Sequence, residues 1–398
     1  MSAPRRKFDP LRELFPGDAL GGVVLITAAL FAMAWANSPW STSYFGLLEA
    51  RLPVSVGPVA LDLSVLHWIN DLVMAVFFLV VGMEIKREFL AGELRDPRRA
   101  ALPIAGALGG MVVPALIYAA FNHGTEAAHG WGIPMATDIA FSLGVLALLG
   151  PSVPRGITVF LAALAIADDL GAVLVIAVFY TAHLNLGALW IAGGIVAVLA
   201  MLEQAGVRRL SVWLAAAPFL WFYMHASGVH ATIAGVLLAW TIPLGKAGDP
   251  NISDSPLETL QHGLKPWVTW GVMPLFALAN AGVAMGGMSF ASLAHPVAAG
   301  VGLGLLFGKP IGILGLSFVT VSLGWAKLPR GSGWRQMAGV GMIAGIGFTV
   351  ALFVASLSFR GGTSLEPLAK IGILTASTVS AVLGALFLRW GLARVARA

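Results

Sequence analysis

Residues 170–202 read LGAVLVIAVFYTAHLNLGALWIAGGIVAVLAML, thirty-three positions without one Asp, Glu, Lys or Arg. A helix needs roughly 20 apolar residues to cross the hydrocarbon core of a bilayer, so this stretch is long enough for a crossing and a turn. Strands of a membrane barrel would be about 10 residues of alternating polarity, which this stretch is not. Five more stretches lack those four residue types: 19–48, 100–125, 210–245, 266–308 and 336–359. The sequence therefore predicts an all-α membrane protein.

The composition of the whole chain agrees with this prediction. Of its 398 residues, 58% are hydrophobic and 11% are charged, whereas about one-quarter of an average soluble chain is charged. So few charged side chains cannot cover the surface of a soluble domain, which excludes soluble enzymes, fibrous proteins and disordered proteins. The chain has no Cys, which excludes disulfides, thiolate metal sites and cysteine nucleophiles. We expect residues 1–398 to form one integral membrane domain.

The hydrophobic pattern predicts twelve crossings, which places both termini on one side of the membrane. Arg5–Lys7 before an apolar run that ends Ala34-Trp35-Ala36 is also typical of a signal peptide. We favour a first crossing that is retained rather than cleaved, because an even number of crossings, with both termini on one side, requires it. The seventh and eighth crossings are short and could be one bent element. The predicted crossings are 19–36, 65–85, 100–121, 133–149, 156–180, 186–202, 210–224, 229–242, 267–285, 297–323, 336–357 and 370–388.

The distribution of Lys and Arg tests this topology. Twenty of the 24 cationic residues fall on the side of the N-terminus, three (Arg51, Arg360 and Lys370) on the opposite side, and Lys309 inside a crossing. Cytoplasmic loops carry the excess of Lys and Arg, so residues 1–18 and the C-terminus are predicted to be cytoplasmic. Because topology accounts for these cations, the net charge of +5 does not indicate nucleic-acid binding.

Residues 37–64 form a polar segment on the predicted extracellular side. Within it, Pro53 to Asp62 read as two short alternating segments about Gly57-Pro58, a pattern that favours a β-hairpin. An isolated hairpin is only marginally stable in water. A partner strand from a second subunit is therefore plausible.

Few charged residues remain inside the predicted crossings: Asp138, Asp168, Asp169 and Lys309, with Asp71 nearer an end. Each costs at least a few kcal/mol in the bilayer and indicates function by default. Adjacent helical residues point about 100° apart, so the two neighbouring acids cannot share one partner but can border one funnel. Na⁺ or Li⁺ favours an ionised carboxylate and a proton favours the neutral form. Competition for this pair could drive exchange; the alternative is an acid buried for packing alone.

Lys309 has no acid in its own crossing, so its partner is expected on another helix, with Asp168 or Asp138 as the candidates. The alternative is a lysine that extends to the membrane surface. Glu84 and the segment 86–88 lie at a cytoplasmic end, where a solvated face is the simplest interpretation.

Two crossings are predicted to be interrupted. The fourth contains Pro134 and Asp138, and the eleventh has four glycines. Glycine in a crossing most often permits close packing, but a non-helical break is tolerated where the backbone lines a cavity. Asp138 and Lys309 would then offset the partial charges of the exposed helix ends. The three crossings within residues 100–180 and the three within residues 297–388 start on opposite sides of the membrane, as inverted repeats do. The four glycines are Gly339, Gly341, Gly345 and Gly347.

Five segments carry a specific resemblance within about residues 21–388. On these segments the chain resembles the NhaA-type sodium/proton antiporter family, one of the known examples of inverted repeats. The segments are WINDLVMAVFFLVVG (68–82), ATDIAFSLGVLALLG (136–150), ALAIADDLG (163–171), SGVHATIAG (227–235) and GIGFT (345–349).

The resemblance implies that Asp168 and Asp169 bind the transported Na⁺ or Li⁺ and the protons, that Thr137 lines the site, and that Asp138 with Lys309 balances two crossed broken helices. It implies electrogenic exchange by alternating access, with more than one proton entering per Na⁺ or Li⁺ expelled, in pH and sodium homeostasis. It also implies a homodimer among the lipids of a bacterial inner membrane, with no cofactor, no resident metal and no enzymatic activity.

A pH response in the family involves a cluster at the cytoplasmic funnel and one histidine. In this chain Gln261 and Lys265 depart from the family pattern. The resemblance therefore does not decide whether this chain is strongly activated at alkaline pH. The matching residues are Glu84, Lys86, Arg87, Glu88 and His230.

Two other functions compete with antiport. A sodium-coupled symporter of an organic anion would use Lys309 as a ligand, but it needs a larger pocket with fewer acids. An intramembrane aspartyl protease would need two Asp on separate helices, whereas Asp168 and Asp169 are adjacent and the usual Gly-x-Gly-Asp step is absent.

Overall fold

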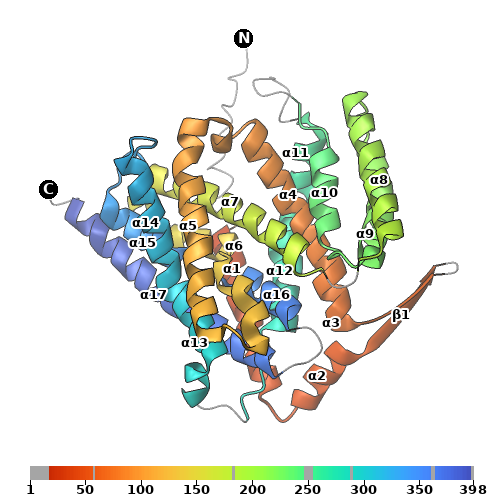
Figure 1. The fold of residues 1–398 in the computed structure, drawn as a ribbon, viewed down its shortest axis with the longest axis horizontal. Coiled ribbons are helices and arrows are strands. Elements are labelled where there is room, and N and C mark those ends of the chain that lie inside the picture. The colour runs from red at the N-terminus through yellow and green to blue at the C-terminus, as the bar shows by residue number, and fades with distance from the viewer. Residues whose placement is uncertain are drawn as a thin grey trace.

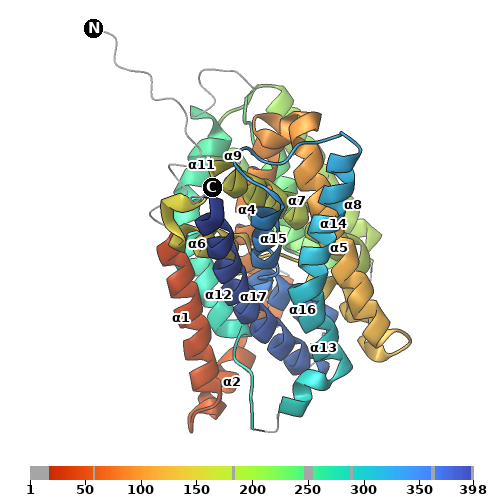
Figure 2. The ribbon, with the colours of Figure 1, turned by 90° about the vertical axis from the view of Figure 1, so that its left-hand side faces the viewer.

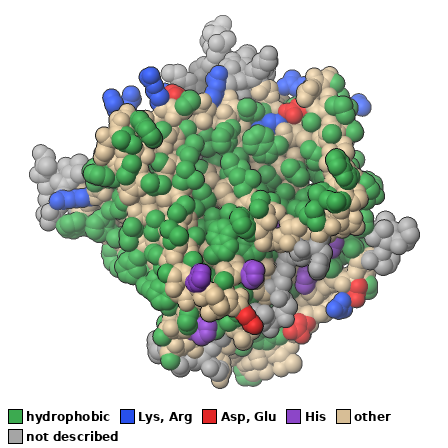
Figure 3. Space-filling view, in the orientation of Figure 1, with side chains coloured by type: hydrophobic (Ala, Val, Ile, Leu, Met, Phe, Trp, Pro, Cys, Tyr) green, Lys and Arg blue, Asp and Glu red, His purple; other side chains and the backbone are tan. Residues whose placement is uncertain are grey.

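The computed structural model describes residues 18–56, 59–181, 184–245, 254–286, 290–359 and 364–395. These residues form a bundle of helices with one two-stranded sheet at its side (Figure 1). Hydrophobic side chains cover the middle of the face seen in Figure 3, while Lys and Arg gather toward its upper edge. The prediction of a mostly helical membrane protein is confirmed.

Six helices among the described residues are long and apolar enough to cross a membrane. Four of them are uninterrupted α-helices, and the other two contain a π-helical turn, where one extra residue widens the helix. The six are α3–η1–α4 (Val65–Trp68, Ile69–Val73, Met74–Leu90), α5 (Pro97–Asn122), α7 (Arg155–Phe179), α8 (Leu186–Gln204), α13–η8–α14 (Pro296–Leu303, Gly304–Gly308, Lys309–Ser322) and α17 (Leu365–Val395).

Three pairs of shorter helices pass the same test together but are bent at a break, which raises the number of candidate crossings to nine. The pair α1 (Asp18–Ala36) and α2 (Ser41–Glu49) is bent by 111°, so α2 turns away from the direction of α1. The other two bends fall where the sequence predicts interruptions. They are 41° between η3 (Glu126–Met135) and α6 (Ile139–Leu148), and 48° between α15 (Trp334–Ile343) and α16 (Phe348–Ser358).

The seventh and eighth predicted crossings correspond to α9 (Leu210–Ser227) and α10 (Ile233–Thr241). Nine residues of α-helix are about 14 Å long, less than half of the hydrocarbon core. Helix α10 packs against α4, and seven of its nine residues are buried. Short and enclosed, α10 does not extend over the full predicted range 229–242.

The ninth predicted crossing is displaced in the structure. The polar segment 243–266 is predicted to be a loop, but α11 (Pro256–Trp267) occupies its second half. The Ser255 side chain accepts from the Glu258 N–H and Pro256 takes the first turn, which are the usual signals of a helix start. The helix continues through η6 (Val268–Val272) and α12 (Met273–Asn280) and ends before the predicted Met285. Short 3₁₀ segments complete the elements: η2 (Glu93–Arg95), η4 (Gly150–Ser152) and η7 (Phe290–Ala294).

The predicted hairpin is confirmed. Strands β1 (Arg51–Val56) and β2 (Val59–Ser64) pair antiparallel, with Arg51 opposite Ser64 and Val56 opposite Val59. Arg51 Nη1 lies 2.9 Å from Asp62 Oδ2 across the strands. The hairpin projects sideways from the bundle (Figure 1). Residues 57–58 at its tip lie outside the described residues.

Two tertiary contacts hold the helices around the centre. Gly109 of α5 and Gly312 of α14 meet so closely that a Cβ on either would collide with the other's carbonyl oxygen. At the other side of the bundle, Asn70 in η1 and Asn280 at the end of α12 are both buried. Their side-chain amides donate to each other, at 2.8 Å and 3.3 Å. Helix α17 lies against α13 and α15 (Figure 2).

Candidate functional site

The adjacent acids lie within α7. Asp168 is fully buried and Asp169 is 4% exposed. Lys309 Nζ, at the start of α14, donates to Asp168 Oδ2 at 2.7 Å, and both side chains are inaccessible to solvent. The predicted pairing of Lys309 with another helix is confirmed, with Asp168 rather than Asp138 as the partner. The close approach of α5 and α14 makes this possible, because the Lys309 stem packs over Gly110.

The second oxygen of Asp168 is different. Oδ1 is buried and accepts no hydrogen bond of good geometry among the described residues, although the hydroxyl and the N–H of Thr137 lie close to the carboxylate. Thr137 lies next to this carboxylate, and Asp169 is close enough to Asp168, Asp138 and Lys309 to interact with each of them electrostatically. A buried oxygen without a donor is costly. Such an oxygen can accept a proton or a hard cation.

The two helix breaks contact each other directly. The Asp138 N–H donates to the Ile346 carbonyl at 2.7 Å, and Thr137 Oγ1 donates to the Ala344 carbonyl at 2.9 Å. Ser142 Oγ donates to the Ile343 carbonyl at 3.2 Å. The last carbonyls of a helix have no partner within the helix. Residues of the first break thus satisfy the carbonyls at the end of α15.

Asp138 caps two helix starts at once. Its Oδ1 accepts from the Phe141 N–H of α6 at 2.9 Å, and its Oδ2 accepts from the Thr349 N–H of α16 at 3.1 Å and from the Thr349 hydroxyl. A negative charge is favourable beside the positive end of a helix dipole. The ammonium of Lys309 donates to Asp168, and its expected action on the helix ends stays a prediction.

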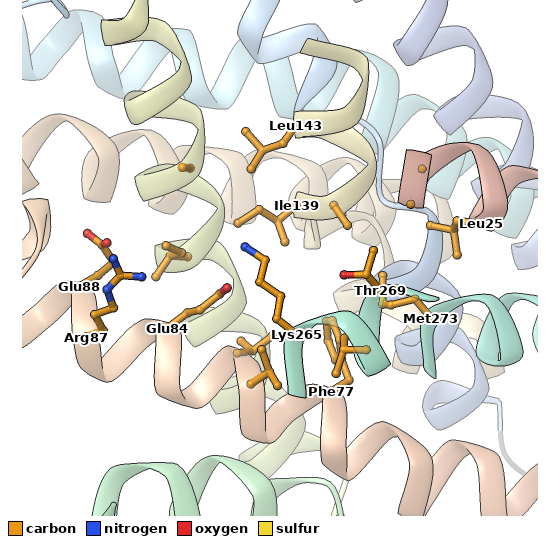
Figure 4. Close-up of a pocket in the computed structure, with 18 residues that line it drawn as sticks. Leu25, Phe77, Glu84, Arg87, Glu88, Ile139, Leu143, Lys265, Thr269 and Met273 are labelled. Carbon is orange, nitrogen blue, oxygen red and sulfur yellow. The ribbon is translucent and has the colours of Figure 1, made fainter. Parts of the chain in front are cut away.

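A cavity of about 170 Å³ opens beside this cluster (Figure 4). Its walls come from α1, α4, α6, α7, α11, η6 and α12, and Ala162 and Ile166 form part of its α7 wall. Asp169 follows Ala162 by seven residues and Ile166 by three, so the three residues share one helix face. Asp169 therefore lies on the cavity-facing side of α7, about one turn beyond the part of the helix that lines the cavity.

Three residues of the predicted pH-response cluster line this cavity: Glu84, Arg87 and Glu88. Arg87 Nε lies 3.0 Å from Glu258 Oε1 of α11. Glu84 accepts from Gln261 Nε2 at 3.5 Å, and Glu88 accepts from a backbone N–H in η2. Gln261 therefore bridges α4 and α11.

Lys86 lies elsewhere, and the interpretation of a solvated face is wrong for it. The side chain is 4% exposed, and its Nζ donates to Glu203 Oε1 at 2.6 Å and to the carbonyls of Trp240 and Ile242 at 2.7 Å and 2.8 Å. It ties α4 to the ends of α8 and α10 and does not line the cavity.

His230 is also separate from the cavity-lining cluster. Its Nδ1 lies 2.7 Å from Thr232 Oγ1 and its Nε2 lies 3.7 Å from Asp71 Oδ1. His225 of α9 approaches the same carboxylate at 3.2 Å.

Several of the contacts involve residues that the sequence analysis did not select. They have charged or hydroxyl side chains at helix ends, which in a sequence look like solvated or capping residues. They are Glu203, Glu258, His225 and Thr349.

Comparison with known proteins identifies the family. Residues 12–388 match the family described as Na⁺/H⁺ antiporter 1. The chain is 50% identical over 380 residues to the Na(+)/H(+) antiporter NhaA 2 of Pseudomonas syringae pv. syringae, covering 95% of this chain and 94% of that protein.

Two further relatives agree. The Na(+)/H(+) antiporter NhaA of Rhodospirillum rubrum is 50% identical over 381 residues, covering 94% of this chain and 95% of the relative. That of Caulobacter vibrioides is 49% identical over 385 residues, covering 96% and 91%. This chain is a multi-pass membrane protein, a transporter rather than an enzyme, and it belongs to the Na⁺/H⁺ antiporter 1 family.

Proposed function

We propose that the protein is an electrogenic antiporter that expels Na⁺ or Li⁺ in exchange for entering protons. The observation that carries the proposal is the buried Asp168 Oδ1, which accepts no hydrogen bond of good geometry among the described residues and lies beside Asp169, while Ala162 and Ile166 on the Asp169 face of α7 line a cavity. Relatives about 50% identical over most of their length bear the name Na⁺/H⁺ antiporter.

Competition for the acid pair supplies the mechanism. A cation that reaches Asp169 along the cavity favours the ionised carboxylates, and Thr137 adds oxygen ligands. Protons that arrive from the opposite side restore the neutral form and release the cation. Asp168 alternates between Lys309 and the cation, while Asp138 holds the two helix starts in place. More than one proton per Na⁺ makes each cycle transfer charge.

The finer topology also belongs to this proposal. The nine candidate crossings, together with α9, α10 and the continuous α11–η6–α12, sum to twelve. The concentration of Lys and Arg toward one edge (Figure 3) supports cytoplasmic N- and C-termini in a bacterial inner membrane. The segments 100–180 and 297–388 form the inverted repeats, each with a broken second member. The hairpin lies outside the cell and pairs with that of a second subunit.

A pH response is proposed for the residues at the cavity mouth and for His230. Glu84, Arg87 and Glu88 act on the cavity directly. Lys86 acts through the helix that it anchors, and His230 through Asp71.

Two competing functions are less well supported. Asp168 and Asp169 sit on one helix, and Asp168 is bound to Lys309, so they cannot act as the facing pair of an aspartyl protease. In a symporter Lys309 would be free to hold an organic anion, but its ammonium is buried against Asp168.

The test uses the purified chain in proteoliposomes with an imposed pH gradient. We expect Na⁺ and Li⁺ to dissipate the gradient, faster when a membrane potential drives the net charge movement. Asp169→Asn removes the response, whereas Asp96→Asn, which changes an exposed acid in the α5 cap, retains it. The antiporter proposal fails if Na⁺ moves no protons, and accumulation of an organic anion would then support the symporter.

A further inference from the structure

We propose that Lys265 is a tethered cation that competes with incoming Na⁺ in the cavity and thereby sets the apparent Na⁺ affinity of the cavity side. This inference rests on the proposed antiport. It adds a residue that limits cation access, distinct from the acids that bind the cation.

The first support is where Lys265 lies. The residue is in the last turn of α11 and lines the cavity together with Glu84, Arg87 and Glu88. Figure 4 shows its side chain extending into the cavity, with the terminal nitrogen between Glu84 and Ile139. Ile139 directly follows Asp138, so the ammonium lies by the part of the cavity wall that adjoins the start of α6.

The second support is the balance of charge around the cavity. Arg87 is bound to Glu258, so a carboxylate of α11 already holds its guanidinium. Lys265 has no ion-pair partner among the described residues. A lysine ammonium is a compact, hydrated charge on a flexible four-carbon stem. It can therefore approach the Glu84 carboxylate, where an entering Na⁺ would also be held.

The third support is the route itself. Ala162 and Ile166 lie in the cavity wall on the α7 face that leads to Asp169. Glu84 is close enough to Asp169 to interact with it electrostatically. In a wet cavity, two unit positive charges about 7 Å apart repel enough to weaken occupancy about three- to tenfold, so an ammonium in the wall of this cavity disfavours a cation that enters it.

A purely structural role makes a different prediction. The aliphatic stem of a lysine can also pack on apolar surface, here the wall of the cavity. Loss of that interaction would lower the melting temperature and the amount of folded protein, but it would not change the Na⁺ concentration at half-maximal rate. The separation of KM from the maximal rate therefore distinguishes the two roles.

The experiment measures the Na⁺ dependence of pH-gradient dissipation by the full chain in proteoliposomes at about 10 mM ionic strength, with choline as the balancing cation. We expect Lys265→Gln and Lys265→Met to lower KM for Na⁺ about three- to tenfold with less than a twofold change in maximal rate. Lys265→Arg keeps the wild-type KM. Lys327→Gln, which removes an exposed lysine that does not line the cavity, is the matched control.

Ionic strength gives a second readout. Raising choline chloride to about 300 mM shortens the screening length, so the KM difference between wild type and Lys265→Gln should shrink at least twofold. An unchanged or higher KM in both neutral variants overturns the proposal, as does an equal fall in Lys327→Gln. If wild type shows no Na⁺-dependent proton movement, the antiport itself has failed instead.

Discussion

Lys86 is the clearest case of a residue whose role depends on its partners. Its ammonium is satisfied by Glu203 and by two carbonyls at the end of α10. We expect Lys86→Met to lower the free energy of unfolding by about 2–3 kcal/mol, below the 3–5 kcal/mol of a fully buried broken pair, because Glu203 is 28% exposed. Thermal denaturation in detergent measures the change. Lys327→Met is the control, and equal melting of the two variants would refute the anchoring role.

Asp138 makes a contrasting prediction. Asp138→Asn keeps the size of the cap but removes the charge that faces the starts of α6 and α16. Each charge–dipole interaction contributes about 0.3–1 kcal/mol, so we expect a stability loss of about 1–2 kcal/mol. The turnover rate should fall by a larger factor than the change in ion selectivity, which is measured as the ratio of the Na⁺ rate to the Li⁺ rate. Stability and transport assays test this against Asp96→Asn; if activity and melting are both unchanged, Asp138 is not a functional cap.

The candidate site was predictable from the sequence at the level of single residues. A charge inside the bilayer costs at least a few kcal/mol and indicates function by default. On this ground the sequence singles out Asp138, Asp168, Asp169 and Lys309. The partner of Lys309 could be narrowed to Asp168 or Asp138 from the sequence, but the partner of Asp138 could not, since Thr349 lies far along the chain and only the packing of two broken helices brings them together.

At the scale of elements, the break between α15 and α16 depends on Gly345. A Cβ at this position would lie 2.6 Å from the Leu305 carbonyl oxygen and 2.8 Å from Ser380 Oγ. Because a backbone atom cannot move aside cheaply, Gly345→Ala should destabilise the protein by about 1–3 kcal/mol and reduce transport at least tenfold.

The matched control lies in a neighbouring helix. At Gly315 in α14 no atom lies within 4 Å of the position that an added methyl group would take, so Gly315→Ala should be neutral or stabilising by up to about 1 kcal/mol. Melting temperature and transport rate are measured for both variants. If Gly345→Ala behaves like Gly315→Ala, the break does not require a glycine.

Helices, breaks and strands were predictable where the residue types and their spacing along the chain decide the structure. The breaks at Asp138 and Gly345 follow from proline, acid and glycine inside apolar runs, and β1–β2 follows from alternation about Gly57-Pro58. Helix α11 was not predicted, because its polar sequence resembles a loop, although Ser255-Pro256 before Glu258 is a signal of a helix start. Helix α10 is shorter than hydropathy suggests, since hydropathy does not register where a helix ends inside the protein.

At the scale of the whole molecule, the proposed orientation predicts accessibility. The chain lacks cysteine, so Thr42→Cys in α2 and Lys327→Cys in the connection after α14 each introduce one exposed thiol. In intact spheroplasts an impermeant maleimide should label only Thr42→Cys, and Lys327→Cys only after lysis. Labelling of Lys327→Cys alone in intact spheroplasts would reverse the proposed topology, and labelling of both variants would refute the odd number of crossings between the two positions.

The Asn70–Asn280 pair gives the bundle a link that does not titrate. A side-chain amide neither gains nor loses a proton in water, and it carries no charge for Na⁺ to displace. The two mutual hydrogen bonds between η1 and α12 therefore do not depend directly on pH or on the charge of the transport acids. We expect this link to stay closed while the charged parts of the protein move.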